Sequence, residues 1–249
     1  TDGKNNALPC GFDPGGTWIL YTSEKPESRV PASRVSDYDV MQKPVTGRGD
    51  LFIVDLNGEH ENLIAPEIAT VRMQVVGFPG VHEYYLTHAA WLSDTRFAVP
   101  VIVSGKTDLY QYDIQGRAWG PITTLGDCTW SAWNPDEQSL AYRSGFDVRV
   151  LQTQDKDDRV LTTPAGMRGG SYYDYSLAWR PGANAVAYVS YGEAWVTDAD
   201  GTNRIQVPLT VSSTPLTDLA WSPDGRFLYT ISDLQIDRID VNSLIEASR

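Results

Sequence analysis

The sequence contains little of what metal and thiol sites are built from. Of its 249 residues only two are cysteine and three are histidine. Cys10 and Cys128 are too few for a disulfide scaffold and too far apart in sequence to form a metal-ligand motif. His82 and His88 flank a segment that does not have the HExxH spacing of zinc peptidases. We therefore predict unpaired cysteines, no metal site and no cofactor.

Motifs of hydrolytic catalysis are absent as well. The sequence has no Gly-x-Ser-x-Gly nucleophile elbow, and its nearest approach, residues 169–173, lacks the closing glycine. We predict that the chain is not an enzyme. One catalytic alternative stays open, a glycosidase with paired carboxylates, for which Asp127, Asp174 and Asp218 are the candidates.

Positive charge and long apolar runs are also scarce. The chain has 20 Lys and Arg against 32 Asp and Glu, a formal net charge of −12. Such a surface repels phosphate backbones, which excludes nucleic acid as a partner. No apolar run approaches the ~20 residues that a membrane-spanning helix needs, so we expect no membrane insertion. The sequence begins with neither an initiator methionine nor a signal-peptide pattern, and we expect it to be part of a larger chain.

Aromatic residues and turn formers are abundant, and they recur in a repeat. The chain has 8 Trp, 13 Tyr, 21 Gly and 15 Pro, a composition typical of many short strands joined by turns. The repeat is a small residue, an aromatic anchor, a turn with Pro, Asp or Gly, and a hydrophobic strand. It reads LAWSPDGRFLYTIS at 219–232, LAWRPGANAVAYVS at 177–190 and SAWNPDEQSLAYRS at 131–144, with looser copies at 89–102 and 11–23. The anchors are Phe12, Trp91, Trp133, Trp179 and Trp221.

The spacing of the repeat predicts the fold. The last four anchors are 42, 46 and 42 residues apart, close to the length of a four-stranded propeller blade. Further strands with two-residue alternation follow each anchor. Third strands are expected at 50–58, 108–116 and 193–201, and fourth strands at 61–64, 121–125, 159–163 and 204–209. We predict an all-β protein, one β-propeller domain over 1–249 made of four-stranded antiparallel blades.

The number of blades depends on one irregular stretch. Phe12 and Trp91 lie 79 residues apart, almost two repeats. We prefer five blades, with loop insertions at 24–48 and 65–85, and a sixth blade in this stretch is the alternative. Residues 2–8 are interpreted as the outer strand of the last blade, which would close the ring and remove exposed strand edges.

The repeat resembles that of the bacterial TolB-like β-propellers, relatives of the WD repeat. The resemblance rests on the aromatic-Ser-Pro-Asp-Gly turn at 221–225 and the Asp-x-Asp-Gly turn at 198–201, and it covers most of the chain. It implies a bacterial, extracytoplasmic protein, periplasmic or extracellular, but names no activity, because such propellers host many tasks. We interpret Asp198 and Asp200 as turn residues rather than calcium ligands, since the equivalent turns lack such paired carboxylates.

One face of the predicted propeller is the candidate binding surface. We define the top end of a blade as the end where its first strand begins. The position three residues before the anchor lies there and varies between blades, whereas the position just before the anchor is always small, as packing requires. Long loops such as 164–175 also reach the top end, and loops on a rigid scaffold often bind ligands. The predicted ligand-binding residues are His88, Trp130, Asp174, Tyr175, Ser176, Asp218, Tyr84, Tyr172 and Tyr173.

We therefore predict a non-catalytic interaction module that binds a protein or peptide partner on its top face. The alternative is a carbohydrate-active or hydrolase-associated propeller with a pocket at the channel mouth. The turns at the opposite, bottom end of the blades, which hold Gln115, Lys156 and Asn203, are predicted to take no part in this binding.

Overall fold

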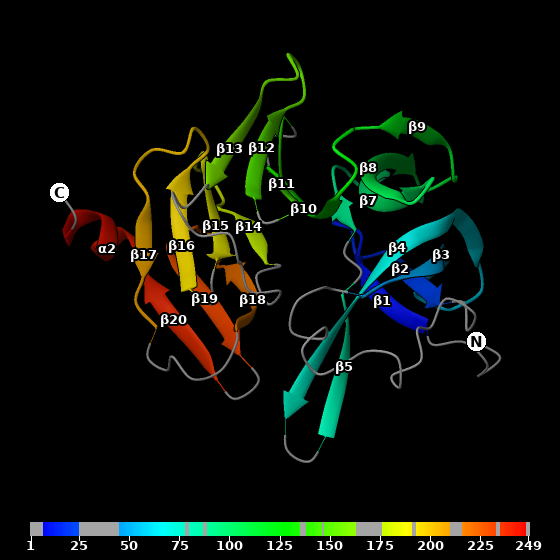
Figure 1. Ribbon diagram of the computed structural model, residues 1–249, viewed down its shortest axis with the longest axis horizontal. Coiled ribbons are helices and arrows are strands. Elements are labelled where there is room, and N and C mark those ends of the chain that lie inside the picture. The colour runs from blue at the N-terminus through cyan, green and yellow to red at the C-terminus, as the bar shows by residue number, and fades with distance from the viewer. Residues whose placement is uncertain are drawn as a thin grey trace. The chain divides into compact units, whose positions relative to one another are not determined.

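The structure is a computed structural model in which most of the chain can be described (Figure 1). The described residues are 7–24, 45–77, 80–86, 89–134, 138–145, 147–162, 176–190, 193–209, 216–232 and 235–247. The chain divides into two compact units, Thr1–Thr129 and Trp130–Arg249. Each unit is considered by itself.

The first unit consists of two antiparallel blades. Blade 1 contains β1 (Ala7–Phe12), β2 (Trp18–Glu24), β3 (Val45–Asp55) and β4 (Asn62–Gly77). Blade 2 contains β6 (Ala90–Trp91), β7 (Arg96–Val103), β8 (Lys106–Asp113) and β9 (Ala118–Pro121). A single pairing, Ile68 with Val101, joins the two blades into one nine-stranded sheet.

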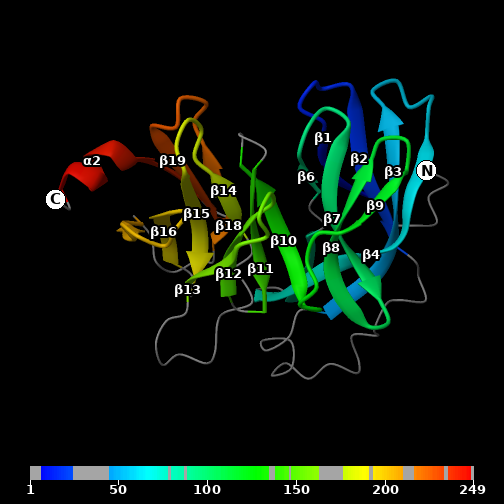
Figure 2. The same ribbon diagram turned by 90° about the horizontal axis from the view of Figure 1, so that it is seen from above.

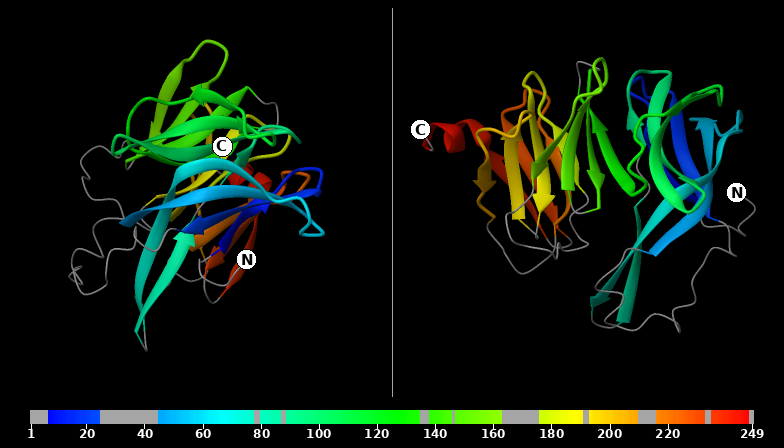
Figure 3. Two further views of the ribbon diagram at one scale, coloured as in Figure 1. Left: turned by 90° about the vertical axis from the view of Figure 1, so that its right-hand side faces the viewer. Right: turned by 45° about the horizontal axis from the view of Figure 1, so that its top comes forward.

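The stretch 65–85 was predicted to be a loop insertion, but its described residues are strand. β4 continues beyond blade 1 and pairs with β5 (Gly80–Leu86) up to Gly77 opposite Gly80. The hairpin extends away from the rest of blade 1 (Figures 1 and 3). The other predicted insertion, 24–48, is partly strand, since Glu24 belongs to β2 and residues 45–48 belong to β3. Its remaining residues, 25–44, lie outside the described part of the chain.

The second unit contains the next three sheets, which Figure 2 shows from above. Blade 3 contains β10 (Cys128–Trp133), whose first two residues fall in the first unit, β11 (Ser139–Ser144), β12 (Asp147–Gln152) and β13 (Asp158–Thr162). Blade 4 contains β14 (Leu177–Trp179), β15 (Ala185–Ser190), β16 (Glu193–Asp198) and β17 (Ile205–Val207). Blade 5 contains β18 (Leu216–Trp221), β19 (Phe227–Ser232) and β20 (Ile236–Asp240), followed by the helix α2 (Val241–Ala247).

Two local expectations differ from the observed elements. The fourth strand of blade 2 lies at 118–121 rather than 121–125, because Asp113 closes a tight turn by accepting the backbone N–H of Arg117. Ala7 and Leu8 of the predicted closing segment 2–8 instead pair with β2 in blade 1. Its other residues are not described, so closure of the ring stays a prediction.

The five anchors occupy equivalent positions, as the repeat predicted. Each is the last residue of the first strand of its blade, and the anchors are Phe12, Trp91, Trp133, Trp179 and Trp221. In the second unit the indole N–H groups connect neighbouring blades. Trp179 Nε1 donates to the carbonyl oxygen of Ala132 at 2.7 Å, and Trp221 Nε1 donates to that of Ala178 at 3.1 Å. These acceptors are the small residues before the preceding anchors, where a larger side chain would crowd the approaching indole.

In the turn after the last anchor, the Ser, Asp and Gly of the repeat each have a structural role. Ser222 Oγ accepts the backbone N–H of Phe227 at 2.8 Å, and Asp224 Oδ1 accepts that of Arg226 at 3.0 Å. Gly225 has a φ of +67°, and a Cβ there would overlap the carbonyl oxygen of Pro181 in blade 4. Arg180 Nε donates to the Gly225 carbonyl at 2.7 Å. The bottom turns of blades 4 and 5 are therefore packed against each other.

The two cysteines are free and buried, which confirms that they are unpaired. Burial raises the pKa of the Cys10 thiol to about 12 and that of Cys128 to about 11. Both thiols are therefore protonated at neutral pH and poorly suited to nucleophilic chemistry.

Candidate functional site

The top ends of blades 4 and 5 bring together two of the residues predicted to bind a ligand. Ser176 immediately precedes β14 and Asp218 lies in β18. Ser176 Oγ donates to Asp218 Oδ1 at 2.7 Å. The backbone N–H of Leu219 donates both to Ser176 Oγ, at 2.8 Å, and to Asp218 Oδ1, at 2.7 Å. The residues three positions before the anchors of blades 4 and 5 are thus in direct contact.

A local irregularity in β18 helps to position the Asp218 carboxylate. The pairing of β18 with β19 shifts register between Leu216 and Asp218. Such bulges bend a strand and redirect a side chain. The backbone donor of Leu219 could not be identified from the sequence, because every residue except proline carries the same N–H group.

Burial gives the two side chains different roles. Ser176 is only 3 % exposed, so its hydroxyl fixes Asp218 and is not itself open to solvent. Asp218 is exposed, and its Oδ2 atom makes no hydrogen bond or ion pair with any residue that the structure describes. One carboxylate oxygen is therefore held in place while the other can accept a bond from a ligand.

Trp130, which lies three residues before the anchor of blade 3, is partly buried. It packs against a core cluster that includes Leu177 and Trp179. Part of its ring therefore stabilises the junction of blades 3 and 4, and only the remainder can contact a ligand.

The other predicted site residues are placed only in part. Tyr84 lies in β5, opposite Met73 of β4 in the hairpin. The remaining candidates lie outside the described residues; they are His88, Tyr172, Tyr173, Asp174 and Tyr175. Of the three carboxylates named for a glycosidase, Asp127 and Asp218 belong to different units and Asp174 is not described. Both the site assignment and the glycosidase alternative remain predictions.

Acidic side chains at the bottom turns, in contrast, are occupied by their own turns. Asp200 Oδ1 accepts the backbone N–H of Thr202 at 2.9 Å, and Asp198 Oδ2 accepts from the Asn203 amide at 2.6 Å. The interpretation of Asp198 and Asp200 as turn residues is therefore confirmed.

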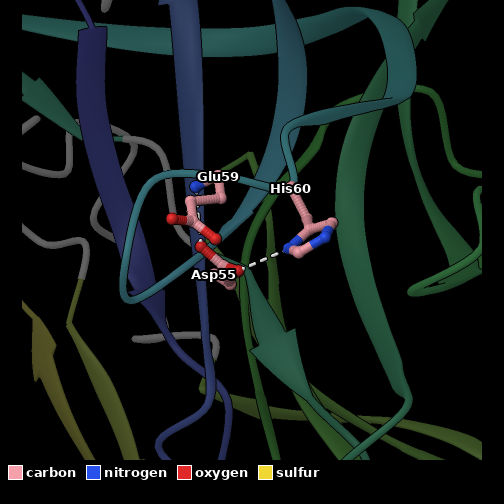
Figure 4. A group of neighbouring side chains, drawn as sticks. All are labelled: Asp55, Glu59 and His60. Atoms are coloured by element: carbon pink, nitrogen blue, oxygen red, sulfur yellow. Dashed lines mark hydrogen bonds and ion pairs between the residues drawn. The ribbon is translucent and has the colours of Figure 1, made fainter.

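A similar turn in blade 1 brings together Asp55, Glu59 and His60 (Figure 4). One potential metal-ligand atom from each lies within 4.8 Å of the others. However, Asp55 Oδ1 already accepts the backbone N–H groups of Asn57 and Glu59, and its Oδ2 lies 2.7 Å from His60 Nδ1. The hydrogen bond from His60, followed by that from the Glu59 backbone, lowers the pKa of Asp55. We assign this group to the stability of the β3–β4 turn.

None of the helices in the described residues is long and apolar enough to cross a membrane.

Comparison with known proteins identifies the fold but not a specific relative. No family model matches the chain, and no curated protein matches its sequence. Among solved structures, the chain is similar to the Dos1 propeller, with a TM-score of 0.54 and 13 % identity over 95 % of this chain. The chain spans 55 % of the Dos1 propeller chain. It is also similar to a putative TolB from Agrobacterium tumefaciens, with a TM-score of 0.48 and 17 % identity over 92 % of this chain and 90 % of that one.

The similarity to the Dos1 propeller agrees with the repeated antiparallel blades and the equivalent anchors described above. The chain therefore has a β-propeller fold.

Proposed function

We propose that this chain is a non-catalytic interaction module that binds a peptide segment of a partner protein at the top ends of blades 4 and 5. The observation that carries the proposal is the Asp218 carboxylate. Its Oδ1 is fixed by Ser176 and by the Leu219 backbone, while Oδ2 is unoccupied among the described residues. Such preorganisation lowers the entropic cost of binding.

The charge of the site determines which partner we propose. Asp218 is an exposed acid in a chain of net charge −12, so both the site and the overall field favour a basic ligand. Trp130 in the neighbouring blade can supply apolar contact, since aromatic residues often anchor interfaces. We therefore propose a peptide with lysine or arginine, and we retain the extracytoplasmic location that the TolB-like repeat implies.

Binding of a defined basic peptide tests this proposal. We expect acetyl-Gly-Lys-Leu-Lys-Gly-amide to bind the full chain in a calorimetric titration at about 0.1 M salt, where the Debye length is about 10 Å. Asp218→Asn removes the charge but keeps the shape, and we expect it to weaken binding about tenfold, which corresponds to ~1.4 kcal/mol. Ser176→Ala should weaken binding less, because it frees the carboxylate to rotate without removing it.

The matched control is Glu246→Gln, which removes one exposed negative charge from α2 of the same unit. We expect it to change the affinity less than about twofold, because Glu246 is not part of the Ser176–Asp218 hydrogen-bonded group and exposed charges interact weakly at about 0.1 M salt. Equal weakening of peptide binding by both variants would mean that the affinity depends on net charge alone, which would contradict the proposed site. Failure of the lysine peptide to bind better than its glutamine counterpart would contradict the proposed ligand.

A further inference from the structure

Blade 2 contains a cavity of about 320 Å³ that the sequence did not indicate. It lies between two turns at the bottom end of the blade, the turn from β6 to β7 and the turn from β8 to β9. The lining residues used below are Thr95, Arg96, Asp113, Ile114, Arg117 and Trp119. The volume is near the lower limit of small-molecule pockets, about 300–1,000 Å³, and suits one or two side chains of a peptide.

One backbone hydrogen bond joins the two turns, and two more close the second turn. The N–H of Ile114 donates to the carbonyl of Thr95 at 2.9 Å, across the two turns. Within the second turn, Asp113 N–H donates to the Arg117 carbonyl at 3.1 Å, and Gly116 N–H donates to the Asp113 carbonyl at 2.9 Å. The walls of the cavity therefore belong to a fixed backbone arrangement.

The only acid among these lining residues is already satisfied. Asp113 Oδ1 accepts the backbone N–H groups of Gln115 at 3.0 Å and Arg117 at 2.9 Å, and Oδ2 lies 3.0 Å from Arg117 Nε. Burial acts to raise the pKa of Asp113, but the backbone N–H donors of Arg117 and Gln115, the Arg117 charge and a hydrogen bond from the Trp119 side chain outweigh it and lower the pKa. Asp113 is thus a carboxylate at neutral pH whose charge is matched by Arg117.

Arg96, unlike Arg117, carries a charge that Asp113 does not neutralise. It is exposed at the start of β7, and no acidic side chain in the described residues forms an ion pair with it. Its guanidinium lies 5.4 Å from the centroid of the Trp119 ring, and that of Arg117 lies 4.4 Å away. Two arginines and one aspartate give the cavity a formal charge of +1 within a chain of −12.

Trp119 provides apolar surface beside this charge. It lies in the outer strand β9 and is 53 % exposed. Exposed tryptophan next to arginine is a common composition of interface anchors.

We propose that this cavity is a second binding site, which takes a carboxylate side chain of an acidic peptide. Arg96 donates to the carboxylate, whose planar geometry matches the guanidinium fork, and Trp119 contacts the adjacent peptide. A single unmatched positive charge suits a monovalent carboxylate better than a divalent phosphate. This site differs from the one at Asp218 in its ligand charge and in the end of the blade that it occupies.

A purely structural role for the arginines predicts a different outcome, and blade 5 supplies the comparison. Arg226 and Arg238 lie over the Phe227 ring at 4.9 and 4.8 Å, and Arg226 pairs with Asp240. This group has the same charges as the group in blade 2, but its aromatic residue is partly buried. Arg238→Gln is therefore the matched control for Arg96→Gln.

The experiment is a calorimetric titration of the full chain with acetyl-Gly-Glu-Leu-Glu-Gly-amide at neutral pH and about 0.1 M salt, which screens the repulsion from the net charge of −12. We expect binding that is weakened about tenfold by Arg96→Gln and also weakened by Trp119→Ala, partly retained in Arg96→Lys, and unchanged within about twofold in Arg238→Gln. The glutamine version of the peptide should bind about tenfold more weakly than the glutamate version. Arg96 is exposed, so the thermal midpoint of Arg96→Gln should equal that of the unmodified chain.

Three outcomes would overturn the proposal. They are no detectable binding of the glutamate peptide, equal affinities for the glutamate and glutamine peptides, and equal loss of affinity in Arg96→Gln and Arg238→Gln. Inorganic phosphate that binds as tightly as the glutamate peptide would contradict the choice of a carboxylate ligand.

Discussion

Asp113 and Asp224 at the bottom of their blades and Asp218 at the top of blade 5 are held in different ways. At the bottom, Asp113 and Asp224 accept backbone N–H groups of the turns that contain them. At the top, Asp218 is held through one oxygen by Ser176 and leaves the other oxygen open among the described residues. An acid inside a tight turn is part of the fold, whereas an acid fixed from one side has capacity for a ligand.

This difference separates carboxylates that the fold uses from carboxylates that can bind a ligand. The sequence contains 32 Asp and Glu, and counting them identifies no site. Carboxylates that accept several backbone N–H groups have little remaining hydrogen-bonding capacity. The comparison therefore predicts that replacing the turn-bound acids Asp113 and Asp224 lowers stability, whereas replacing Asp218 lowers the affinity for the basic peptide.

The largest effect is expected at Gly225, where the bottom turns of blades 4 and 5 meet. Gly225→Ala places a Cβ against the Pro181 carbonyl and also requires a left-handed backbone conformation, since φ is +67°. The conformation costs about 1–2 kcal/mol and the overlap a further 1–3 kcal/mol. We expect a loss of roughly 3 kcal/mol in the free energy of unfolding, measured by urea denaturation.

Gly182, in the corresponding turn of blade 4, provides the control. It has a φ of +70°, but nothing lies within 4 Å of an added Cβ. Gly182→Ala should therefore lose only the conformational part, about 1–2 kcal/mol. Equal losses in the two variants would contradict the close packing of these turns.

A smaller effect is expected from pH at Asp113. Its pKa is lowered in the folded protein, so its carboxylate stabilises the fold above the pKa of the unfolded chain, about 3.9. This contribution is lost as the pH falls through the folded pKa. Thermal midpoints between pH 7 and pH 3 should fall less in Asp113→Asn than in the unmodified chain. If the thermal midpoints of the two proteins fell equally with pH, the stabilisation attributed to the Asp113 carboxylate would be contradicted.

The repeat was sufficient to predict most of the fold, because anchors and turns are local. Each aromatic anchor ends a first strand, and the Ser-Pro-Asp-Gly turn has the hydrogen bonds that its residues suggest. The β4–β5 hairpin was interpreted as a loop because a blade of four strands has no position for it. Gly-Phe-Pro-Gly at 77–80 nevertheless separates two stretches that contain β-branched or aromatic residues. The seven-residue helix α2 was missed because two turns are too short to establish helical periodicity.

The candidate site was predictable only in part. Aligning the anchors placed Ser176 and Asp218 in one column, and the structure joins them by a hydrogen bond. The burial of Ser176 and the free oxygen of Asp218 depend on packing and on a bulge, which no alignment of the repeats reveals. The cavity at Arg96, Arg117 and Trp119 was missed because two separate turns form it.

Hydrogen–deuterium exchange of the full chain, with and without the lysine peptide, tests the central claim most directly. If the top ends of blades 4 and 5 bind the peptide, the amides of residues 176–179 and 216–221 will exchange more slowly in its presence, and that of Leu219, which donates to Ser176 and Asp218, will be among them. The bottom turns at 180–184 and 222–226 should be unaffected. Protection confined to those turns, with no change at 216–221, would contradict the account.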